Sequence, residues 1–221
     1  MQFDIPALAP GDAYKLLASV VVPRPIALVS TLGPNGQTNA APFSFFNLVG
    51  SSPPTVALGI ADRAPGSPKD THANIVRTRS FVVNLVDESL AEAMNICGID
   101  FPNGESEIEA AGLTPAPSVA ASAPRIANSP VQLECRLAQI AEVGDNKIVL
   151  GEVVFLHIRD EFVDMGKRHV HTDALRLIGR MHGGGWYART TDLFDMPRIP
   201  YAQWQAEHPA APPADKAGAP E

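Results

Sequence analysis

Residues 131–158, VQLECRLAQIAEVGDNKIVLGEVVFLHI, decide the fold class of this chain. Two long runs that contain many apolar residues, 131–143 and 147–158, flank the short polar segment 144–146. This pattern predicts two long strands joined by a turn, because such a turn reverses the chain between antiparallel neighbours. The second run mixes alternating with continuous apolar character, as expected where one face of a strand is shared with a partner.

Shorter strands and helices are predicted around this hairpin. The Asn-Gly pair in GPNGQ, residues 33–37, favours a tight turn between two of the strands. Strands are expected at residues 26–31, 38–49, 55–60 and 80–86. Helices are expected at residues 11–20, from Asp70 or Thr71 onward, and at 87–98, with one helical turn at 106–112 in an irregular stretch from 99 to 128. Because strands outnumber helices and no regular crossover helices separate them, an antiparallel barrel with peripheral helices is favoured over a doubly wound sheet.

The amino-acid composition limits the classes of protein to which this chain can belong. The chain has 221 residues, 45% of them hydrophobic and 19% charged, which is typical of one globular domain. A formal net charge of -7 argues against a protein that coats nucleic acid or an anionic membrane, since those partners need clustered Lys and Arg. The N-terminus lacks the pattern of a signal peptide, and no apolar run reaches the roughly 20 residues that span a bilayer. A cytoplasmic location is therefore expected.

The domain is expected to cover residues 1–200. Residues 201–221 form a Pro- and Ala-rich C-terminal tail whose last part has almost nothing to bury, so a mobile extension is predicted there. Cys97 and Cys135 lie far apart without a zinc-ligand spacing, and both are predicted to be buried thiols.

The usual signatures of catalytic sites are absent from the sequence. It contains no GxGxxG after a strand, no GxxxxGK[ST], no GxSxG and no HExxH. His169 and His171 could point to one side of an extended segment, but no third ligand is evident nearby, so a solvated loop is favoured and no metal is predicted. His157 lies in a predicted strand, where a structural role is favoured.

Three stretches are nevertheless unusual. Residues 38–54 carry small or polar side chains and a proline where a strand would use bulky residues, which lets a flat ligand approach the backbone; the alternative is an irregular barrel corner. Residues 69–71, Lys-Asp-Thr, precede a helix, with Asp70 as its cap, and could bind a phosphate; ordinary capping with a solvated lysine is equally compatible. In residues 175–190, three glycines after His182 precede Trp186 and Tyr187, which could cover a planar ring. Tyr187 could equally be a core or interface residue.

Taken in order, several motifs resemble the flavin reductase-like family of FMN-binding split barrels. They are PRPIALVST, GPNGQTNAAPFSFFNLVGSSPP, KDTHANI followed by SFVVNLV, GDNKIVLGEV and LIGRMHGGGWYAR, and they run from Pro23 to Arg189. The resemblance implies a mainly β fold, an antiparallel, Greek-key-like split β-barrel with peripheral helices. It also implies a homodimer that binds FMN, or sometimes FAD, near the subunit interface, with NADH or NADPH as electron donor.

The resemblance also assigns residues to the cofactor site. The side of the isoalloxazine and ribityl groups is expected to be lined by Thr31, Asn39, Ala41, Pro42 and Ser44. The end of the ribityl phosphate is expected to be lined by Ser51, Ser52, Lys69, Thr71 and Asn74. No protein acid or base is strictly required, because the flavin carries out the hydride chemistry once the two rings are held face to face.

One position departs from the family pattern. Many members have Gly-Asp-His at the turn between the two long strands, whereas this chain has Asn146 in place of the histidine. An amide can hydrogen-bond but cannot become cationic, which puts the electron donor and the rate of reduction in doubt. The hypothesis here is that His182 compensates from the glycine-rich loop, so both residues are candidate flavin or nicotinamide contacts.

The sequence leaves three functions open. The leading hypothesis is an NAD(P)H:flavin oxidoreductase that uses FMN, and the reductase component of a two-component monooxygenase is one form that it could take. The alternatives are a tightly FMN-bound electron-transfer flavoprotein that serves an electron-acceptor protein, and a barrel without turnover. All three need the same groove, so the residues alone do not separate them.

Overall fold

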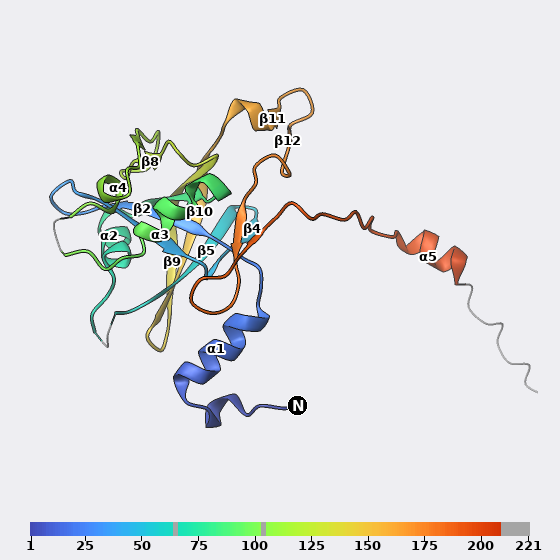
Figure 1. Ribbon diagram of the computed structural model, residues 1–221. Coiled ribbons are helices and arrows are strands. Elements are labelled where there is room, and N and C mark those ends of the chain that lie inside the picture. The colour runs from blue at the N-terminus through green and yellow to red at the C-terminus, as the bar shows by residue number, and fades with distance from the viewer. Residues whose placement is uncertain (64–65, 103–104, 209–221) are drawn as a thin grey trace, which may run out of the picture. The chain divides into compact units, whose positions relative to one another are not determined.

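A seven-stranded antiparallel sheet, in the order β3-β2-β6-β9-β10-β5-β4, dominates the computed structural model (Figure 1). The structure describes residues 1–63, 66–102 and 105–208. The strands of the sheet are β2 (Ala27–Leu32), β3 (Thr38–Phe43), β4 (Phe46–Ser51), β5 (Pro54–Ala61), β6 (Ser80–Leu85), β9 (Val131–Val143) and β10 (Asn146–Ile158). The prediction of a mainly β, antiparallel fold is confirmed.

The central hairpin forms as predicted, with one difference at its turn. Asn146 pairs with Val143, so the loop consists of Gly144 and Asp145 alone and Asn146 is the first residue of β10. Gly144 has a φ of 61°, a conformation that suits glycine at a tight turn. Further along, a register shift falls between Leu150 and Gly151 of β10. Such bulges bend a strand, which a curled sheet requires.

The predicted strand at residues 38–49 is wrong as a single element. It breaks at Ser44 and Phe45 into β3 and β4, which occupy the two opposite edges of the sheet. Seven strands about 4.8 Å apart span roughly 29 Å when flat, far more than a two-residue link can bridge. The sheet must therefore curl until its edges approach, and the backbone N–H of Gly59 on β5 donates to the carbonyl of Phe45 at 2.7 Å. Pro42, which has no N–H to donate, accordingly lies on an edge strand.

Smaller elements surround the sheet. A three-stranded sheet contains β1 (Arg24–Pro25), β13 (Ile178–Arg180) and β14 (Tyr187–Arg189), and two short pairs are β7 (Pro115–Ala116) with β8 (Arg125–Ile126) and β11 (Val163–Asp164) with β12 (His169–Val170). The α-helices are α1 (Pro10–Val20), α2 (Asp70–Thr78), α3 (Ala91–Ile96), α4 (Glu107–Ala110) and α5 (Tyr201–Glu207). Short 3-10 helices are η1 (Ile5–Ala7), η2 (Glu88–Leu90) and η3 (Asp160–Phe162). Each predicted helix is present, and the described residues of the irregular stretch from 99 to 128 hold only α4, β7 and β8.

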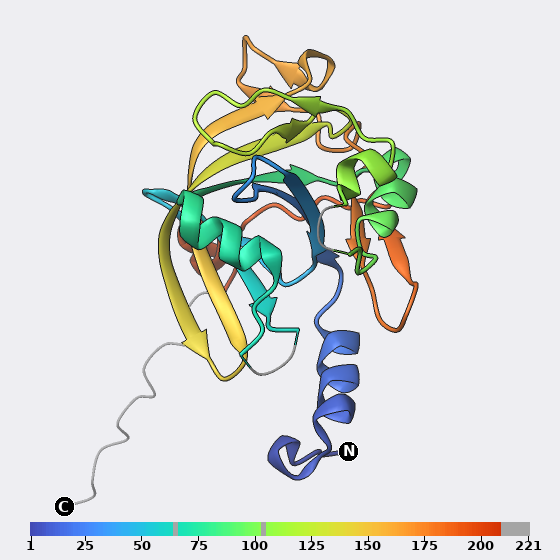
Figure 2. The ribbon, with the colours of Figure 1, turned by 90° about the vertical axis from the view of Figure 1, so that its left-hand side faces the viewer.

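Strand β2 is buried on both faces and separates two apolar clusters. On one face, Val29 packs in a cluster with Phe81 and with Ile75 of α2. On the other face, Leu28 packs in a cluster that includes Met94 of α3 and Ile108 of α4. In Figure 2, α2 accordingly lies on one side of β2 and the green helices α3 and α4 on the other. This arrangement holds α2 and α4 on opposite sides of the β2–β3 hairpin, where the site described below is built.

The chain separates into the unit Met1–Thr191 and the remainder from Asp192, which carries α5. The domain boundary at residue 200 stays a prediction, and most of the predicted tail, residues 209–221, lies outside the described residues. Cys97 and Cys135 are free and buried, as predicted. Within the described part of the chain, every helix is too short or too polar to cross a bilayer.

Candidate functional site

The N-terminus of α2 presents backbone N–H groups that can donate hydrogen bonds to a ligand. Lys69 is the N-cap residue, with φ -68° and ψ 150°, and none of the described side chains caps the helix there. The prediction that Asp70 is the cap is wrong: Asp70 is the first helical residue, and its carboxylate accepts a hydrogen bond from Arg63 at 2.9 Å. The first backbone N–H groups of a helix have no partner within the helix and favour an anion. At nine residues, α2 is long enough for this effect to matter.

Four of the predicted site residues form a hydrogen-bonded polar cluster beside this helix start. Thr31 on β2 and Asn39 on β3 are directly opposite each other in the sheet. The side-chain amide of Asn39 donates to Thr71 Oγ1 at 3.2 Å and lies 3.4 Å from Thr31 Oγ1. Asn74, one turn along α2, donates to Thr31 Oγ1 at 3.1 Å. Thr31, Thr71 and Asn74 are buried, so these contacts fix β2, β3 and α2 in one arrangement.

A cavity of about 150 Å³ opens next to this cluster, and we call it the α2 cavity. Its walls hold predicted site residues from both β3 and the start of α2: Asn39, Ala41, Pro42, Lys69 and Thr71. Ala41 and Pro42 present small, apolar surface, whereas Lys69 and Thr71 present an ammonium and a hydroxyl. Two of the three unusual stretches, residues 38–54 and 69–71, therefore meet at one place, because β3 lies beside the first turn of α2.

The electrostatics of the α2 cavity are mixed. Arg63 and Lys69 line it together with Asp70, Asp100 and Glu107. Arg63 is paired with Asp70, whereas Lys69 makes no ion pair with any described residue, and its Nζ lies 5.8 Å from the centre of the Phe43 ring. Lys69 is thus the cation that remains available to an anionic ligand.

Glu107, the first residue of α4, also faces this cavity. Its Oε2 accepts a hydrogen bond from the backbone N–H of Ala40 at 3.2 Å, and burial raises the pKa of its carboxyl. A raised pKa means that the proton is held more readily than in water, which lessens repulsion of a nearby anion.

The donor set fits a phosphate monoester. It combines an ammonium, a guanidinium, a buried threonine hydroxyl, a side-chain amide and the N–H groups at a helix start, which are the groups that recognise phosphate oxygens. Flat, small residues Ala41 and Pro42 continue from this end of the cavity toward the C-terminal end of β3. A ligand with a phosphate at one end and a planar group at the other matches this order.

A second, larger cavity of about 600 Å³ lies past the C-terminal end of β3, and we call it the Ser44 cavity. Ser44 and Asn146 both line it, as does the exposed ring of Phe45. Arg24 Nε lies 3.4 Å from Ser44 Oγ, and the amide of Asn146 donates to Asp145 Oδ1 at 2.9 Å. Asn146, the residue that replaces the family's histidine, therefore lines the same cavity as Ser44.

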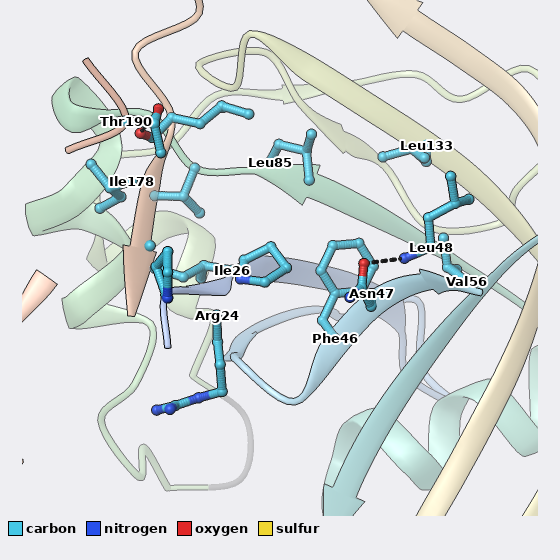
Figure 3. Close-up of a pocket in the computed structure, with 15 residues that line it drawn as sticks. Arg24, Ile26, Phe46, Asn47, Leu48, Val56, Leu85, Leu133, Ile178 and Thr190 are labelled. Carbon is cyan, nitrogen blue, oxygen red and sulfur yellow. Dashed lines mark hydrogen bonds between the residues drawn. The ribbon is translucent and has the colours of Figure 1, made fainter. Parts of the chain in front are cut away.

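An apolar cavity of about 380 Å³ adjoins the Ser44 cavity, since residues 23–25 and 46–47 line both. Figure 3 shows Ile26, Phe46, Leu48, Leu85, Leu133 and Ile178 around it. Arg24 is buried at its edge, with its guanidinium turned away from the cavity in Figure 3. That guanidinium donates to the carbonyls of Ala18 at 2.6 Å, Val21 at 2.8 Å and Met181 at 3.1 Å. It fixes the end of α1 and the start of the glycine-rich loop to β1.

Three predicted site residues lie elsewhere in the single chain. Ser51 and Ser52 are exposed at the turn between β4 and β5, the opposite end of β5 from Ala61. The pair between Arg63 and Asp70 places the start of α2 near the Ala61 end, so the two serines do not join Lys69 and Thr71 within one chain. Their assignment to the phosphate end stays a prediction. His182 is exposed in the glycine-rich loop, with its ring centroid 6.0 Å from that of Trp186.

Arg63, Glu107 and Arg24 were not predicted as site residues. Arg63 could have been noticed as a cation seven residues before Asp70, in a segment with several turn-forming residues. The structure shows that the two side chains pair. Arg24 could have been noticed as a cation between two prolines in an apolar stretch. Glu107 gave no local signal, since its contact with Ala40 joins segments that are distant in sequence.

Several known proteins are similar to this chain in sequence and in fold. A family model described as "Flavin reductase like domain" matches residues 19–172. The 2-nitrobenzoate 2-nitroreductase NbaA of Pseudomonas fluorescens is 37% identical, with a TM-score of 0.83, over 91% of this chain and 98% of that one. Component B of nitrilotriacetate monooxygenase from Bacillus cereus is 32% identical, also with a TM-score of 0.83, over 89% of this chain and 98% of that one.

A more distant structure confirms the predicted split barrel. It is described as a putative flavin reductase with split barrel domain from Shewanella frigidimarina, and it covers 90% of this chain and all of its own. At 24% identity and a TM-score of 0.77, it shows the fold alone.

Proposed function

Because this chain belongs to the flavin reductase-like domain family, we propose that it binds FMN and transfers hydride from NADH or NADPH to the flavin. The observation that carries the proposal is the α2 cavity, in which Lys69, Thr71 and the free N–H groups of α2 face the small residues of β3. In an acidic chain, an anion must be held by such a local donor set.

The residues that line the α2 cavity and the Ser44 cavity have distinct roles in the proposed function. Lys69, Thr71 and Arg63 would bind the phosphate, while Ala41 and Pro42 would let the planar ring lie against β3. Ser44 and Asn146 would line the side where the nicotinamide enters, because they share the larger cavity past the end of β3. FMN supplies the hydride acceptor when bound, so the residues bind, orient and exclude water.

The physiological acceptor of the electrons is proposed to be a monooxygenase partner. The support is the similarity to component B of nitrilotriacetate monooxygenase, whose name makes it one part of a multicomponent enzyme. A second candidate function is direct reduction of a nitroaromatic compound. The similarity to 2-nitrobenzoate 2-nitroreductase and the apolar cavity beside Ser44 favour it.

We expect the purified protein loaded with FMN to be bleached when it is mixed anaerobically with NADH or NADPH. The measurement is stopped-flow absorbance in the flavin bands, with each nucleotide separately. Reoxidation by 2-nitrobenzoate under the same conditions would assign direct nitro reduction, whereas reoxidation by free flavin or oxygen alone would favour the reductase component. If neither nucleotide reduces the bound flavin, the reductase proposal is wrong.

We also propose a homodimer, in which β4 contributes to the contact. β4 is an edge strand, and Leu48 and Val49 on it are 62% and 57% exposed. Exposed apolar residues on an unpaired edge strand favour association with another chain.

Light scattering after gel filtration should give twice the mass of one chain for the unaltered protein and one chain mass for the variant Leu48→Glu. Val76→Glu on α2, also exposed in one chain, is the control and should stay dimeric; a monomeric unaltered protein would contradict the proposal.

A further inference from the structure

Arg24 is the one charged side chain among the described residues that line the Ser44 cavity and the adjoining apolar cavity. It is only 7% exposed, and no described residue forms an ion pair with it. An arginine guanidinium keeps its charge in proteins, and a buried charged side chain usually has a partner of opposite charge. The described part of the chain therefore holds a buried positive charge without a counter-ion at this place.

The guanidinium of Arg24 is held by oxygen atoms that carry no formal charge. Nη1 donates to the carbonyls of Ala18 and Val21, and Nη2 donates to the carbonyl of Met181. Nε lies 3.4 Å from Ser44 Oγ, which is long for a hydrogen bond. A guanidinium has five N–H groups, and these contacts use at most four of them. One N–H group of Nη2 is left without a protein acceptor among the described residues.

The positive charge lies on the side of the Ser44 cavity. In Figure 3 the guanidinium is turned away from the apolar cavity. Its Cζ lies 5.8 Å from the centre of the Phe45 ring, and Phe45 and Ser44 both line the Ser44 cavity. In the proposed function, the planar ring continues along β3 to this end of the strand, and the nicotinamide enters beside Ser44 and Asn146. Arg24 is thus beside the proposed place of hydride transfer.

Hydride transfer changes the charge of the flavin. The C–H bond at C4 of the nicotinamide breaks and an N–H bond forms at N5 of the flavin, so that one proton and two electrons move together. The nicotinamide is oxidised and becomes cationic, whereas the neutral flavin ring is reduced and gains one negative charge. A fixed positive charge between apolar walls stabilises that anion more than it stabilises the neutral, oxidised ring.

We propose that Arg24 supplies the positive charge that stabilises the reduced flavin. The inference rests on the proposed function, because it places the flavin ring at this end of β3. Asn146 lines the same cavity in place of the family's histidine, but its amide cannot carry a charge. His182 is the other candidate, and it is exposed in the glycine-rich loop, where water and salt screen a charge. The buried guanidinium is screened much less.

The first test compares the midpoint potential of FMN bound to the unaltered chain with that of free FMN, by anaerobic spectroelectrochemical titration. We expect reduced FMN to bind at least ten-fold tighter than oxidised FMN, which for a two-electron couple raises the potential by about 30 mV. This measurement needs no variant, so it tests the proposal even if replacement of Arg24 prevents folding. A bound potential equal to or below that of free FMN would overturn the proposal.

A second test separates the charge of Arg24 from its hydrogen bonds. Arg24→Gln removes the charge, whereas Arg24→Lys keeps the charge and loses most of the fixed N–H donors. We expect Arg24→Gln to lower the preference for reduced over oxidised FMN about ten-fold, and Arg24→Lys to lower it less than about three-fold. Arg136→Gln removes an exposed arginine outside both cavities and is the control, with an unchanged potential.

Three results would contradict this account. Equal shifts of the potential in Arg24→Gln and Arg24→Lys, or weaker binding of oxidised FMN with an unchanged potential, would show that Arg24 merely holds α1 and the glycine-rich loop in place. A lower potential in His182→Ala with none in Arg24→Gln would assign the charge to His182. Failure of the unaltered chain to bind FMN at all would instead overturn the proposed function, and the role of Arg24 with it.

Discussion

Replacing Lys69 by alanine is expected to weaken FMN binding about 10- to 100-fold while riboflavin affinity changes less than two-fold. A hydrogen bond from a charged group contributes roughly 1.5 to 3 kcal/mol, and about 1.4 kcal/mol corresponds to a factor of ten. Lys69 makes no ion pair with a described residue, so its ammonium is available to the phosphate that distinguishes FMN from riboflavin. Thr71→Ala should act in the same direction, because its buried hydroxyl lines the same cavity.

Calorimetric titration of both flavins into each variant provides the measurement. Lys167→Ala removes an exposed lysine outside the cavities and should leave both affinities unchanged. Equal losses of FMN and riboflavin in the Lys69 variant would place the phosphate elsewhere.

Glu134→Ala is expected to lower the free energy of unfolding by about 3 kcal/mol or more. Glu134 lies on β9 with no exposed surface. Its carboxylate accepts the backbone N–H groups of Val119 at 2.8 Å, Ala120 at 2.6 Å and Ala121 at 2.8 Å, and His157 Nε2 lies 2.7 Å away. Removal leaves these part-buried donors without their acceptor, and a fully buried donor left without a partner costs about 1 to 3 kcal/mol. These contacts also confirm a structural role for His157.

The same carboxylate makes stability depend on pH. Burial opposes ionisation of Glu134, but the three backbone N–H groups and His157 outweigh it and lower its pKa to about 2 from the usual 4.5. A carboxyl whose pKa is depressed by folding contributes stability above its unfolded pKa, and that stability is lost as pH falls through the folded value. The loss is therefore expected between about pH 4.5 and pH 2.

Urea unfolding at pH 7 and pH 3 would measure both effects. The difference between the unaltered chain and Glu134→Ala should be large at pH 7 and smaller at pH 3. Glu152→Ala serves as the control, because its ion pair with Arg136 at 2.7 Å is largely exposed on the arginine side and should contribute less than about 1 kcal/mol. An unchanged urea midpoint in the Glu134 variant would show that the segment at 119–121 is held by other contacts.

The parts of the fold that the sequence predicts are those set by local patterns. The hairpin at 131–158 follows from two apolar runs around a turn, and α2 follows from residues 69–78. The break at Ser44 and Phe45 was missed because apolar residues continue across it. Only the pairing of β3 with β2 and of β4 with β5, far apart in the sheet, shows where the strand must end.

The candidate site was predictable to a similar extent. Lys69, Thr71 and Asn74 are close in one helix, and the turn at 33–37 sets the register that places Thr31 opposite Asn39. The pairing of Arg63 with Asp70 and the contact of Glu107 with Ala40 depend on how loops fold back onto the barrel. Such contacts leave no periodicity in the sequence, and neither does the carboxylate of Glu134.

A crystal structure of the protein with bound FMN tests most directly the claim that a lysine beside a helix start binds the flavin phosphate. The account predicts the phosphate in the α2 cavity, with its oxygens within hydrogen-bonding distance of Lys69 Nζ and of the first N–H groups of α2. A phosphate bound elsewhere, or an α2 cavity closed by the protein's own side chains in the FMN complex, would contradict it.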